Sequence, residues 1–289
     1  MVTDCYRHNA DAIILELLDR PSGAARAAAR GLLAEAVDTA GRGGAEVFVR
    51  IDKAVAYADI KAAVMLGVKG VALSNPESAQ DIDSVGAMLG EREREAGIPD
   101  GELEIMPLLG TARGIWNVRA IVTASARIAC VAIDEVHLCQ SMGIEPTDDF
   151  DPLSFARGRV IVETLAAVKL PLGIGHPLGA LPCAADDSEL ARLADRARNT
   201  GFKGALCPLP AWVAACNAAF TPTDEQVAYY RDVRTAFAQG VARGTAAVPF
   251  PGGRMIDVPV DERAKLVIDW WERCQRRDAE KSAAGRRLL

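Results

Sequence analysis

The sequence predicts an α/β protein whose parallel sheet closes into a TIM (β/α)8-type barrel, followed by a C-terminal helical extension. Short runs that are apolar throughout alternate with longer stretches rich in Ala, Glu and Arg, and such strands are typical of a parallel sheet covered on both faces. The length of 289 residues suits one barrel domain. With 50% apolar and 25% charged residues, the composition is that of a folded globular protein.

Strands and helices are expected to alternate along the chain. The strands are expected at 11–17, 45–51, 70–74, 102–110, 128–134, 170–175 and 201–208. The helices are expected at 22–40, 57–67, 78–97, 113–126, 153–168, 187–200 and 211–220. The first helix carries the usual boundary signals, since Ser22 is a good N-cap residue and Gly41 a good stop.

The pattern contains seven strand–helix units, one fewer than a (β/α)8 barrel needs. Either a strand is hidden in VTDCYR, residues 2–7, or the usual first unit is missing. A doubly wound open sheet is the competing fold. The chain has neither a Gly-x-Gly-x-x-Gly motif after its first strand nor a Gly-rich Lys-Ser/Thr loop, so dinucleotide or P-loop nucleotide binding is not expected.

Charge and cysteine content exclude other classes. The formal net charge is -6 and basic residues cluster only in the terminal tail, so a nucleic-acid groove is not expected. No stretch reaches the roughly eighteen apolar residues of a membrane span. Cysteines at irregular spacings, without a Cys-x-x-Cys pair or a secretory leader, predict reduced thiols and a cytoplasmic location.

Polar residues at the C-terminal ends of the expected strands are candidates for a site, because these ends line the active-site mouth of a barrel. They are Glu16, Asp19, Arg50, Asp52, Asn75, Glu77, Gly110, Thr111, the segment 134–137, His176 and Cys207. Two adjacent carboxylates and a histidine make the segment 134–137 the most chemically suggestive of them.

Six stretches of the chain are specific enough to suggest a family. Four contain an expected strand or its C-terminal end, namely ADAIILELLD, VFVRID, LSNPESAQDI and PLLGTARGI. The two longest are GFKGALCPLPAWVAACNAAFTPTDEQV and GGRMIDVPVDERA. Together they resemble the HpcH/HpaI aldolase and citrate lyase β-subunit-like family, which includes malyl-CoA and citramalyl-CoA lyases. The family's opening strand has no counterpart here, which would explain the missing eighth unit.

The resemblance implies a barrel at residues 1–220 and a C-terminal extension at 221–289 involved in contacts of a homo-oligomer. It implies an enzyme that cleaves or forms a C–C bond of a 3-hydroxyacyl CoA thioester with Mg²⁺, which would chelate a 2-keto acid and neutralise enolate charge. The family's two carboxylate ligands fall on Gly110 and His137. Because glycine offers no ligand and histidine suits other metals better, a degenerate metal site is expected.

Other positions match the family. The matching residues are Asp19, Arg50, Glu77, Thr111 and Asp257. Arg50 is expected to hold a keto-acid carboxylate through its planar guanidinium, and Glu77 and Thr111 are assigned to the same substrate site. Asp19 and Asp257 are expected to be catalytic, Asp257 as the acid or base that related lyases supply to a neighbouring subunit. The positions that depart from the family are Glu16, Leu18, Asn75 and Cys207.

Three interpretations of the segment 134–137 stay open. On an extended strand Glu135 and His137 point to the same side, so they could bind a transition metal together. In the second interpretation the segment is a polar strand end whose carboxylates are solvated or paired with Arg157 or Arg113. In the third, His137 is an acid or base without a metal, aided by Glu135.

Two function classes follow. The first is a divergent C–C lyase or aldolase with altered metal chemistry, acting on a 2-keto or 3-hydroxy acid or its CoA thioester; retention of Arg50, Asp19 and Asp257 favours it. The second is a non-catalytic homologue that keeps the barrel and the oligomer as a scaffold for a ligand or a partner. Joint loss of both metal carboxylates favours the scaffold, and the fold alone cannot decide between the two.

Overall fold

The structure is a computed structural model that describes residues 4–17, 23–145, 150–174 and 187–286. The chain divides into two compact units, Met1–Phe220 and Thr221–Arg287. Each unit contains buried hydrophobic clusters of its own.

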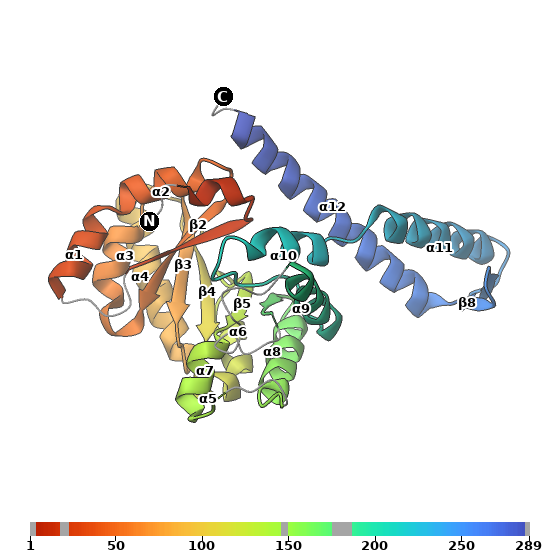
Figure 1. Ribbon diagram of the computed structural model, residues 1–289, viewed down its shortest axis with the longest axis horizontal. Coiled ribbons are helices and arrows are strands. Elements are labelled where there is room, and N and C mark those ends of the chain that lie inside the picture. The colour runs from red at the N-terminus through yellow and green to blue at the C-terminus, as the bar shows by residue number, and fades with distance from the viewer. Residues whose placement is uncertain (1–3, 18–22, 146–149, 175–186, 287–289) are drawn as a thin grey trace. The chain divides into compact units, whose positions relative to one another are not determined.

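Six parallel strands form the sheet of the first unit in the order β1-β2-β3-β4-β5-β6 (Figure 1). They are β1 Ala12–Glu16, β2 Glu46–Asp52, β3 Val68–Ser74, β4 Glu104–Leu109, β5 Cys130–Ile133 and β6 Leu170–Leu172. Beyond β6 the sheet continues as a single parallel bridge between Leu172 and Gly204. The strand predicted at 201–208 is therefore reduced to this bridge.

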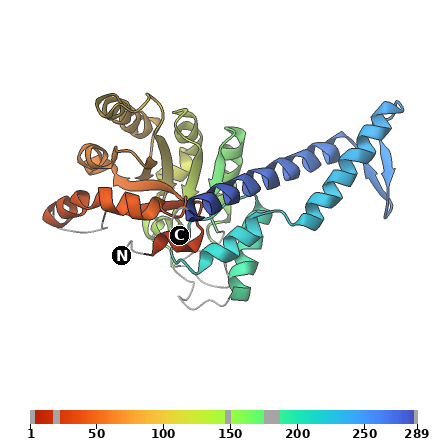
Figure 2. The same ribbon diagram turned by 90° about the horizontal axis from the view of Figure 1, so that it is seen from above.

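Helices connect the strands and lie along the outer side of the curved sheet, where Figure 2 shows them in orange, yellow and green. They are α1 Gly23–Gly31, α2 Leu33–Gly41, α3 Ala56–Ala63, α4 Ala79–Ala96, α5 Ala112–Trp116, α6 Val118–Thr123, α7 Glu135–Met142, α8 Ser154–Ala166, α9 Asp187–Thr200 and α10 Trp212–Phe220. Two short 3₁₀ helices are η1 Cys5–His8 and η2 Lys53–Val55.

Strands that neighbour each other in this sheet are also consecutive in the chain. A doubly wound sheet would reverse its order at a switch point, so the competing prediction is wrong. The predicted TIM-type fold is confirmed in the form of a curled half-barrel. Residues Cys5–His8 form η1 instead of a strand, and within the described ranges β1 has a neighbouring strand on one edge only.

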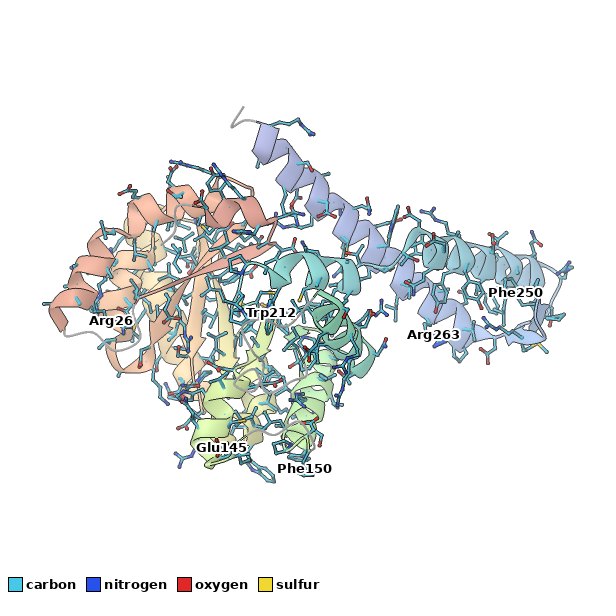
Figure 3. All side chains as sticks on the ribbon, viewed as in Figure 1. Arg26, Glu145, Phe150, Trp212, Phe250 and Arg263 are labelled. Carbon is cyan, nitrogen blue, oxygen red and sulfur yellow. The ribbon has the colours of Figure 1, made fainter. Side chains whose placement is uncertain are left out.

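Alternation along the strands divides the core into two layers. Outward-facing residues pack with the helices in the main core, which includes Trp212 of α10 (Figure 3). The inner layer is the cluster Phe48, Ala72, Met106, Leu108 and Ala132, with Ala12, Ile14, Cys130, Leu172 and Leu206 packed against it. The residues that follow this inner layer at the strand ends are those that position the candidate site.

A buried carboxylate at the far end of α4 ties two loops to the sheet. Glu93 is 0% exposed and accepts hydrogen bonds from the N–H groups of Gly101 at 2.9 Å and Leu103 at 2.7 Å. Both terminal nitrogens of Arg127 donate to it at 2.7 Å. Burial alone would raise the pKa of Glu93, but these hydrogen bonds outweigh burial and hold the pKa below its usual value.

The second unit is a pair of helices that a β-hairpin connects. Its elements are α11 Asp224–Ala242, β7 Val248–Phe250, β8 Arg254–Ile256 and α12 Val258–Arg286. Its core is the cluster Val233, Val248, Ile256 and Ala264. No helix in the described part of either unit combines the length and the apolar character that crossing a membrane requires.

Replacing Glu93 with Gln is expected to lower the free energy of unfolding at pH 7 by about 3–5 kcal/mol, because Arg127 would then lose its buried charge partner and keep only the exposed Asp100. A lowered folded pKa contributes stability above the usual glutamate pKa of about 4.3, and this contribution is lost as pH falls. The deficit of the variant should therefore shrink between pH 7 and pH 3. Urea unfolding followed by circular dichroism measures it.

Glu91→Gln is the matched control, because Glu91 lies exposed on the same helix. Its effect should stay within about 0.5 kcal/mol. Equal effects of the two substitutions, or a deficit of Glu93→Gln that does not change with pH, would contradict the assigned role of Glu93.

Candidate functional site

A polar layer lies directly above the inner core of the half-barrel. Since side chains on one face recur at every second residue, the positions two residues beyond the inner core side chains of β1, β2, β3 and β5 share that face. These positions are Glu16, Arg50, Ser74 and Asp134. On β4 the corresponding position, two residues beyond Leu108, is Gly110.

Arg50 links the members of this layer. Its Nε donates to Ser74 Oγ at 2.8 Å, Nη1 to Glu16 Oε2 at 3.1 Å, and Nη2 to Asp134 Oδ2 at 3.3 Å. Strands β2 and β5 are separated by β3 and β4, which in a flat sheet would place them about 14 Å apart. The contact between Arg50 and Asp134 therefore requires the curl of the sheet.

The electrostatic balance around Arg50 is negative, with two carboxylates against one guanidinium. The exposed fractions of the side chains are 25% for Arg50, 20% for Asp134 and 46% for Glu16. Glu16 is thus the partner that solvent reaches most readily. An incoming carboxylate would bind Arg50 by replacing Glu16 as the acceptor of the Nη1 hydrogen bond.

Asp134 also sets the conformation of the segment that follows it. Its Oδ1 accepts a hydrogen bond from the backbone N–H of His137 at 3.1 Å, which caps α7. The helix begins at Glu135, so the expectation of an extended segment is wrong. Residues two apart in a helix point about 200° apart, and Glu135 and His137 are not brought together.

Glu135 turns into the protein and pairs with Arg157 of α8. Its two oxygens accept from Arg157 Nε and Nη2, each at 2.8 Å, while Arg157 Nη1 donates to Asp151. Burial alone would lower the pKa of Arg157, but Glu135 and Asp151 outweigh burial and raise it. The second interpretation, in which the carboxylates are paired with arginine, describes what the structure shows for Glu135.

His137 turns the other way, toward Gly110. A Cβ placed on Gly110 would lie 2.9 Å from His137 Cβ, 3.2 Å from His137 Cδ2 and 2.5 Å from Asn75 Oδ1. Asn75 has φ 50°, in the left-handed region, and its Oδ1 is buried without a hydrogen-bond partner among the described residues. The space beside Gly110 is therefore filled by the side chains of Asn75 and His137.

These residues do not fit Mg²⁺, which requires several hard oxygen ligands in near-octahedral order. Gly110 has no side-chain ligand atom, Glu135 is bonded to Arg157 and Asp134 to Arg50. Within the described ranges no group of three or more His, Cys, Asp or Glu side chains is placed to hold a metal ion.

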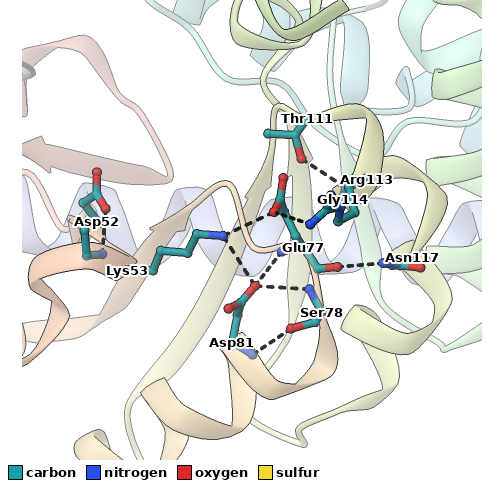
Figure 4. A network of polar contacts seen from close by, with 10 residues as sticks. Asp52, Lys53, Glu77, Ser78, Asp81, Thr111, Arg113, Gly114 and Asn117 are labelled. Carbon is teal, nitrogen blue, oxygen red and sulfur yellow. Dashed lines mark hydrogen bonds and ion pairs between the residues drawn. The ribbon is translucent and has the colours of Figure 1, made fainter.

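A second polar network surrounds Glu77, at the end of β3 (Figure 4). Its Oε2 lies 3.6 Å from Lys53 Nζ and 3.8 Å from Arg113 Nη1, and its backbone carbonyl accepts from Asn117 Nδ2 at 2.8 Å. Thr111 lies in the same region, but its Oγ1 accepts from the Gly114 N–H at 3.0 Å and caps α5. In this structure its hydroxyl therefore has a structural partner.

The remaining candidates from the sequence are Asp19, His176, Asp257 and Cys207. Asp19 and His176 fall outside the described residues. Asp257 belongs to the second unit, where it is exposed and its Oδ1 accepts from the Val260 N–H at 3.1 Å. Cys207 packs against the outer core of the barrel and not against the inner cluster.

Sequence reasoning missed two residues of the site, Ser74 and Lys53. Ser74 could have been found by continuing the two-residue period of β3 beyond Ala72. Lys53 lies in η2, just after β2, and only the position of Glu77 on the next strand gives it a role. No sequence signal marks that pairing.

Comparisons with known proteins agree with this architecture. The family model described as HpcH/HpaI aldolase/citrate lyase matches residues 1–207. Citrate lyase subunit beta of Leuconostoc mesenteroides subsp. cremoris is 27% identical, over 93% of this chain and 88% of that protein. L-malyl-CoA/beta-methylmalyl-CoA lyase of Cereibacter sphaeroides is 25% identical, over 90% of this chain and 86% of that protein.

Solved structures show the same fold. CitE of Mycobacterium tuberculosis, in complex with magnesium, acetoacetate and coenzyme A, has a TM-score of 0.68 and 22% identity over 94% of this chain and 95% of that chain. A citrate lyase from Burkholderia xenovorans has a TM-score of 0.74 and 17% identity over 93% of this chain and 87% of that chain.

Gly110→Ala is expected to lower the free energy of unfolding by about 1–3 kcal/mol, because the new methyl group would overlap Asn75 and His137. Gly158→Ala, in α8, is the matched control: a Cβ there meets nothing within 4 Å, so the helix should gain up to about 1 kcal/mol. Thermal or urea unfolding of both variants gives the comparison. If Gly110→Ala is as stable as the wild type, the close approach around Gly110 is wrong.

Proposed function

The chain belongs to the HpcH/HpaI aldolase/citrate lyase family, and from this premise we propose that it is a carbon–carbon lyase or aldolase acting on a 2-keto or 3-hydroxy acid, in free form or as a CoA thioester. The observation that carries the proposal is Arg50, whose guanidinium lies in the polar layer at the strand ends with an exposed carboxylate as one partner. Relatives named citrate lyase subunit beta and L-malyl-CoA/beta-methylmalyl-CoA lyase support it.

Cleavage of a 3-hydroxy acid of this kind is a reverse aldol reaction. A base removes the proton of the hydroxyl group, the adjacent C–C bond breaks, and its electron pair forms an enolate that is then protonated. We assign carboxylate binding to Arg50, with Glu77 and Thr111 nearby in the substrate site, and the proton transfers to Asp257, Asp19 and His137. His137 adjoins the strand ends, against Gly110.

Two cations strengthen the assignment of an anionic substrate. Lys53 and Arg113 flank Glu77 at distances of 3.6 Å and 3.8 Å, beyond ordinary hydrogen bonds, and the side chain of Arg113 is 74% exposed. Lys and Arg side chains are the groups that bind carboxylate and phosphate oxygens. We also propose that the protein is cytoplasmic and homo-oligomeric, with residues 221–289 involved in the oligomer contacts.

Altered metal chemistry is part of the proposal. Gly110 and His137 stand where the family places its two carboxylates, and Asn75 and His137 fill the space in which one of them would lie. A divalent ion, if the reaction uses one, would have to be held differently from the family's Mg²⁺. The pair Glu135 and His137 does not provide this, because Glu135 faces Arg157.

One observation favours the alternative function, a non-catalytic scaffold that binds a ligand or a partner. The carboxylates nearest the missing ligand positions, Asp134 and Glu135, are both bonded to arginine. A site whose acids serve only as structural ion pairs could bind a small acid without converting it.

Arg50→Ala is expected to lower kcat/KM for thioester cleavage about 100-fold, equivalent to about 2.7 kcal/mol of lost transition-state binding. Arg50→Lys should recover only part of this, since an ammonium group lacks the planar fork. The assay follows formation of acyl-CoA from L-malyl-CoA and β-methylmalyl-CoA by mass spectrometry, with and without Mg²⁺, Mn²⁺ and Zn²⁺. Arg42→Ala, an exposed arginine paired with Asp38, is the control and should leave activity unchanged.

Absence of turnover by the wild type with every thioester and every metal, and in the reverse condensation of acyl-CoA with 2-keto acids, would refute the lyase proposal. Binding of a 2-keto acid under those conditions, abolished by Arg50→Ala, would then support the scaffold.

Restoring the family carboxylates is expected to create an Mg²⁺ site. Gly110→Glu and His137→Asp supply two carboxylates, and Asn75→Gly removes the oxygen that would lie 2.5 Å from the new Cβ. Calorimetric titration of the triple variant with Mg²⁺ and pyruvate should show binding that the wild type lacks. The matched control carries Gly110→Gln in place of Gly110→Glu, which keeps the size and removes the charge. If a folded triple variant binds no more Mg²⁺ than this control, the assignment of the ligand positions is wrong.

A further inference from the structure

The outer face of helix α8 is apolar, whereas surface helices usually present polar residues to solvent. Phe155, Val162 and Leu165 are exposed and lie on one stripe, because residues seven and three positions apart share a face of a helix. Trp116, at the end of α5, and Val168, just beyond the end of α8, are exposed as well. These five side chains make up the α8 face. By contrast, the exposed positions of α4 and α9 are mostly charged or polar.

The inner face of α8 is apolar too. Ala156, Val160 and Ile161 are buried in the main core of the first unit. A helix that is apolar on both sides is typical of one that other structure covers on both sides, and a contiguous exposed apolar patch marks an interaction surface. Among the described residues, nothing covers the α8 face.

Val168 carries a backbone cost that its own unit does not repay. Its φ is 58°, in the left-handed region that β-branched residues rarely adopt. It follows the C-cap residue of α8, a position where glycine is usual, and its N–H donates to the carbonyl of Leu165 at 2.9 Å. The side chain is 91% exposed, so it gains little from packing. A partner that covered Val168 would supply the missing contact.

Two opposite charges lie beside the stripe, about one helical turn apart. The Arg159 guanidinium lies 4.8 Å from the centre of the Trp116 ring, and its Nη2 donates to the Trp116 carbonyl at 2.7 Å. Arg159 Nε is buried without a hydrogen-bond partner among the described residues, and Glu163 forms no ion pair with any of them. If two α8 helices pair antiparallel, Arg159 of each copy faces Glu163 of the other. Parallel pairing would instead set like charges against each other, which is unfavourable.

We infer that the α8 face binds α8 of a second copy of this chain, antiparallel and across a two-fold axis. With Arg159 opposite Glu163, the axis passes close to Val162, so the two Val162 side chains meet at the centre. Phe155 of each copy then lies toward Val168 of the other. A two-fold contact uses one self-complementary patch twice and closes on itself. This inference does not depend on the proposed lyase activity, and its contact lies in the first unit, apart from the oligomer contacts proposed for residues 221–289.

The α8 face is large enough for a specific, reversible interface. The side chains of Trp116 and Phe155 are 65% and 67% exposed, and an aromatic side chain can bury roughly 150–250 Å². Both copies together would therefore bury roughly 400–650 Å² through these aromatics, about half of the roughly 1,000 Å² that a specific interface requires. Val162, Leu165 and Val168 add to this area. An interface of this size predicts a dissociation constant in the micromolar range.

Sedimentation equilibrium of the full chain tests the inference. Val162→Glu places two like charges at the axis and should raise the dissociation constant at least about 100-fold. Its mass should be half that of the wild type at concentrations where the wild type is fully associated, whichever oligomer residues 221–289 form. Leu66→Glu is the matched control, because Leu66 is an exposed apolar residue outside the α8 face. It should leave the dissociation constant unchanged, and circular dichroism confirms that both variants are folded.

Two further variants test the charge pairing and the strain. Glu163→Arg makes both pairings repulsive and should raise the dissociation constant about tenfold, and adding Arg159→Glu should recover most of the loss. Val168→Gly should weaken association, while the urea midpoint of the dissociated chain does not fall.

The inference is overturned if Val162→Glu has the same mass as the wild type at every concentration, or if Leu66→Glu dissociates equally. A second copy paired in the parallel sense is indicated instead if the double charge reversal recovers nothing, and this result overturns the antiparallel arrangement.

Discussion

The carboxylate of Asp134 is the interaction on which the arrangement of the site depends. One oxygen caps α7 by accepting the His137 N–H, and the other pairs with Arg50 from β2. Because the cap starts the helix immediately after β5, Glu135 enters the core and His137 turns to Gly110. The same side chain thus holds β2 to β5 across the curled sheet and decides which way the next three residues face.

Gly110 is the second constraint, and it follows from the first. Once His137 is turned inward, the only residue that fits opposite it is one without a side chain, since a Cβ would also meet Asn75. The residues at positions 75, 110 and 137 therefore form one packed set. A larger side chain at position 110 alone would meet Asn75 and His137.

Much of the fold follows from the sequence, and the site follows only in part. Fully apolar strands alternating with helical stretches predicted the parallel sheet, and motif resemblance predicted the family that the comparisons support. The period of two places Glu16, Arg50 and Asp134 on one face, as the strands show. What could not be predicted is the helix start at Glu135, because a capping side chain ended the strand where the apolar run suggested that it continued. The seventh strand was overestimated for a related reason: apolar residues at 201–208 serve packing on both layers with a single backbone bridge.

The local costs stored at the strand ends bear on whether the site is active or merely structural. Asn75 adopts a left-handed backbone conformation and buries an acceptor that has no donor among the described residues, and an unsatisfied buried polar atom costs about 1–3 kcal/mol. A residue such as Gly, with no amide oxygen and free access to φ 50°, would avoid both costs. Such costs cluster at functional sites, where a ligand or a reacting group can use the unpaired polar atom.

Nearby, Arg50 is held by one well-shielded carboxylate, Asp134, and one accessible carboxylate, Glu16. An acid that displaced Glu16 would find the guanidinium already oriented, so little of its binding energy would be lost in ordering the site. A layer that only stabilised the strand ends would gain more from neutral, fully paired groups, and this difference favours a ligand-binding site over a purely structural one.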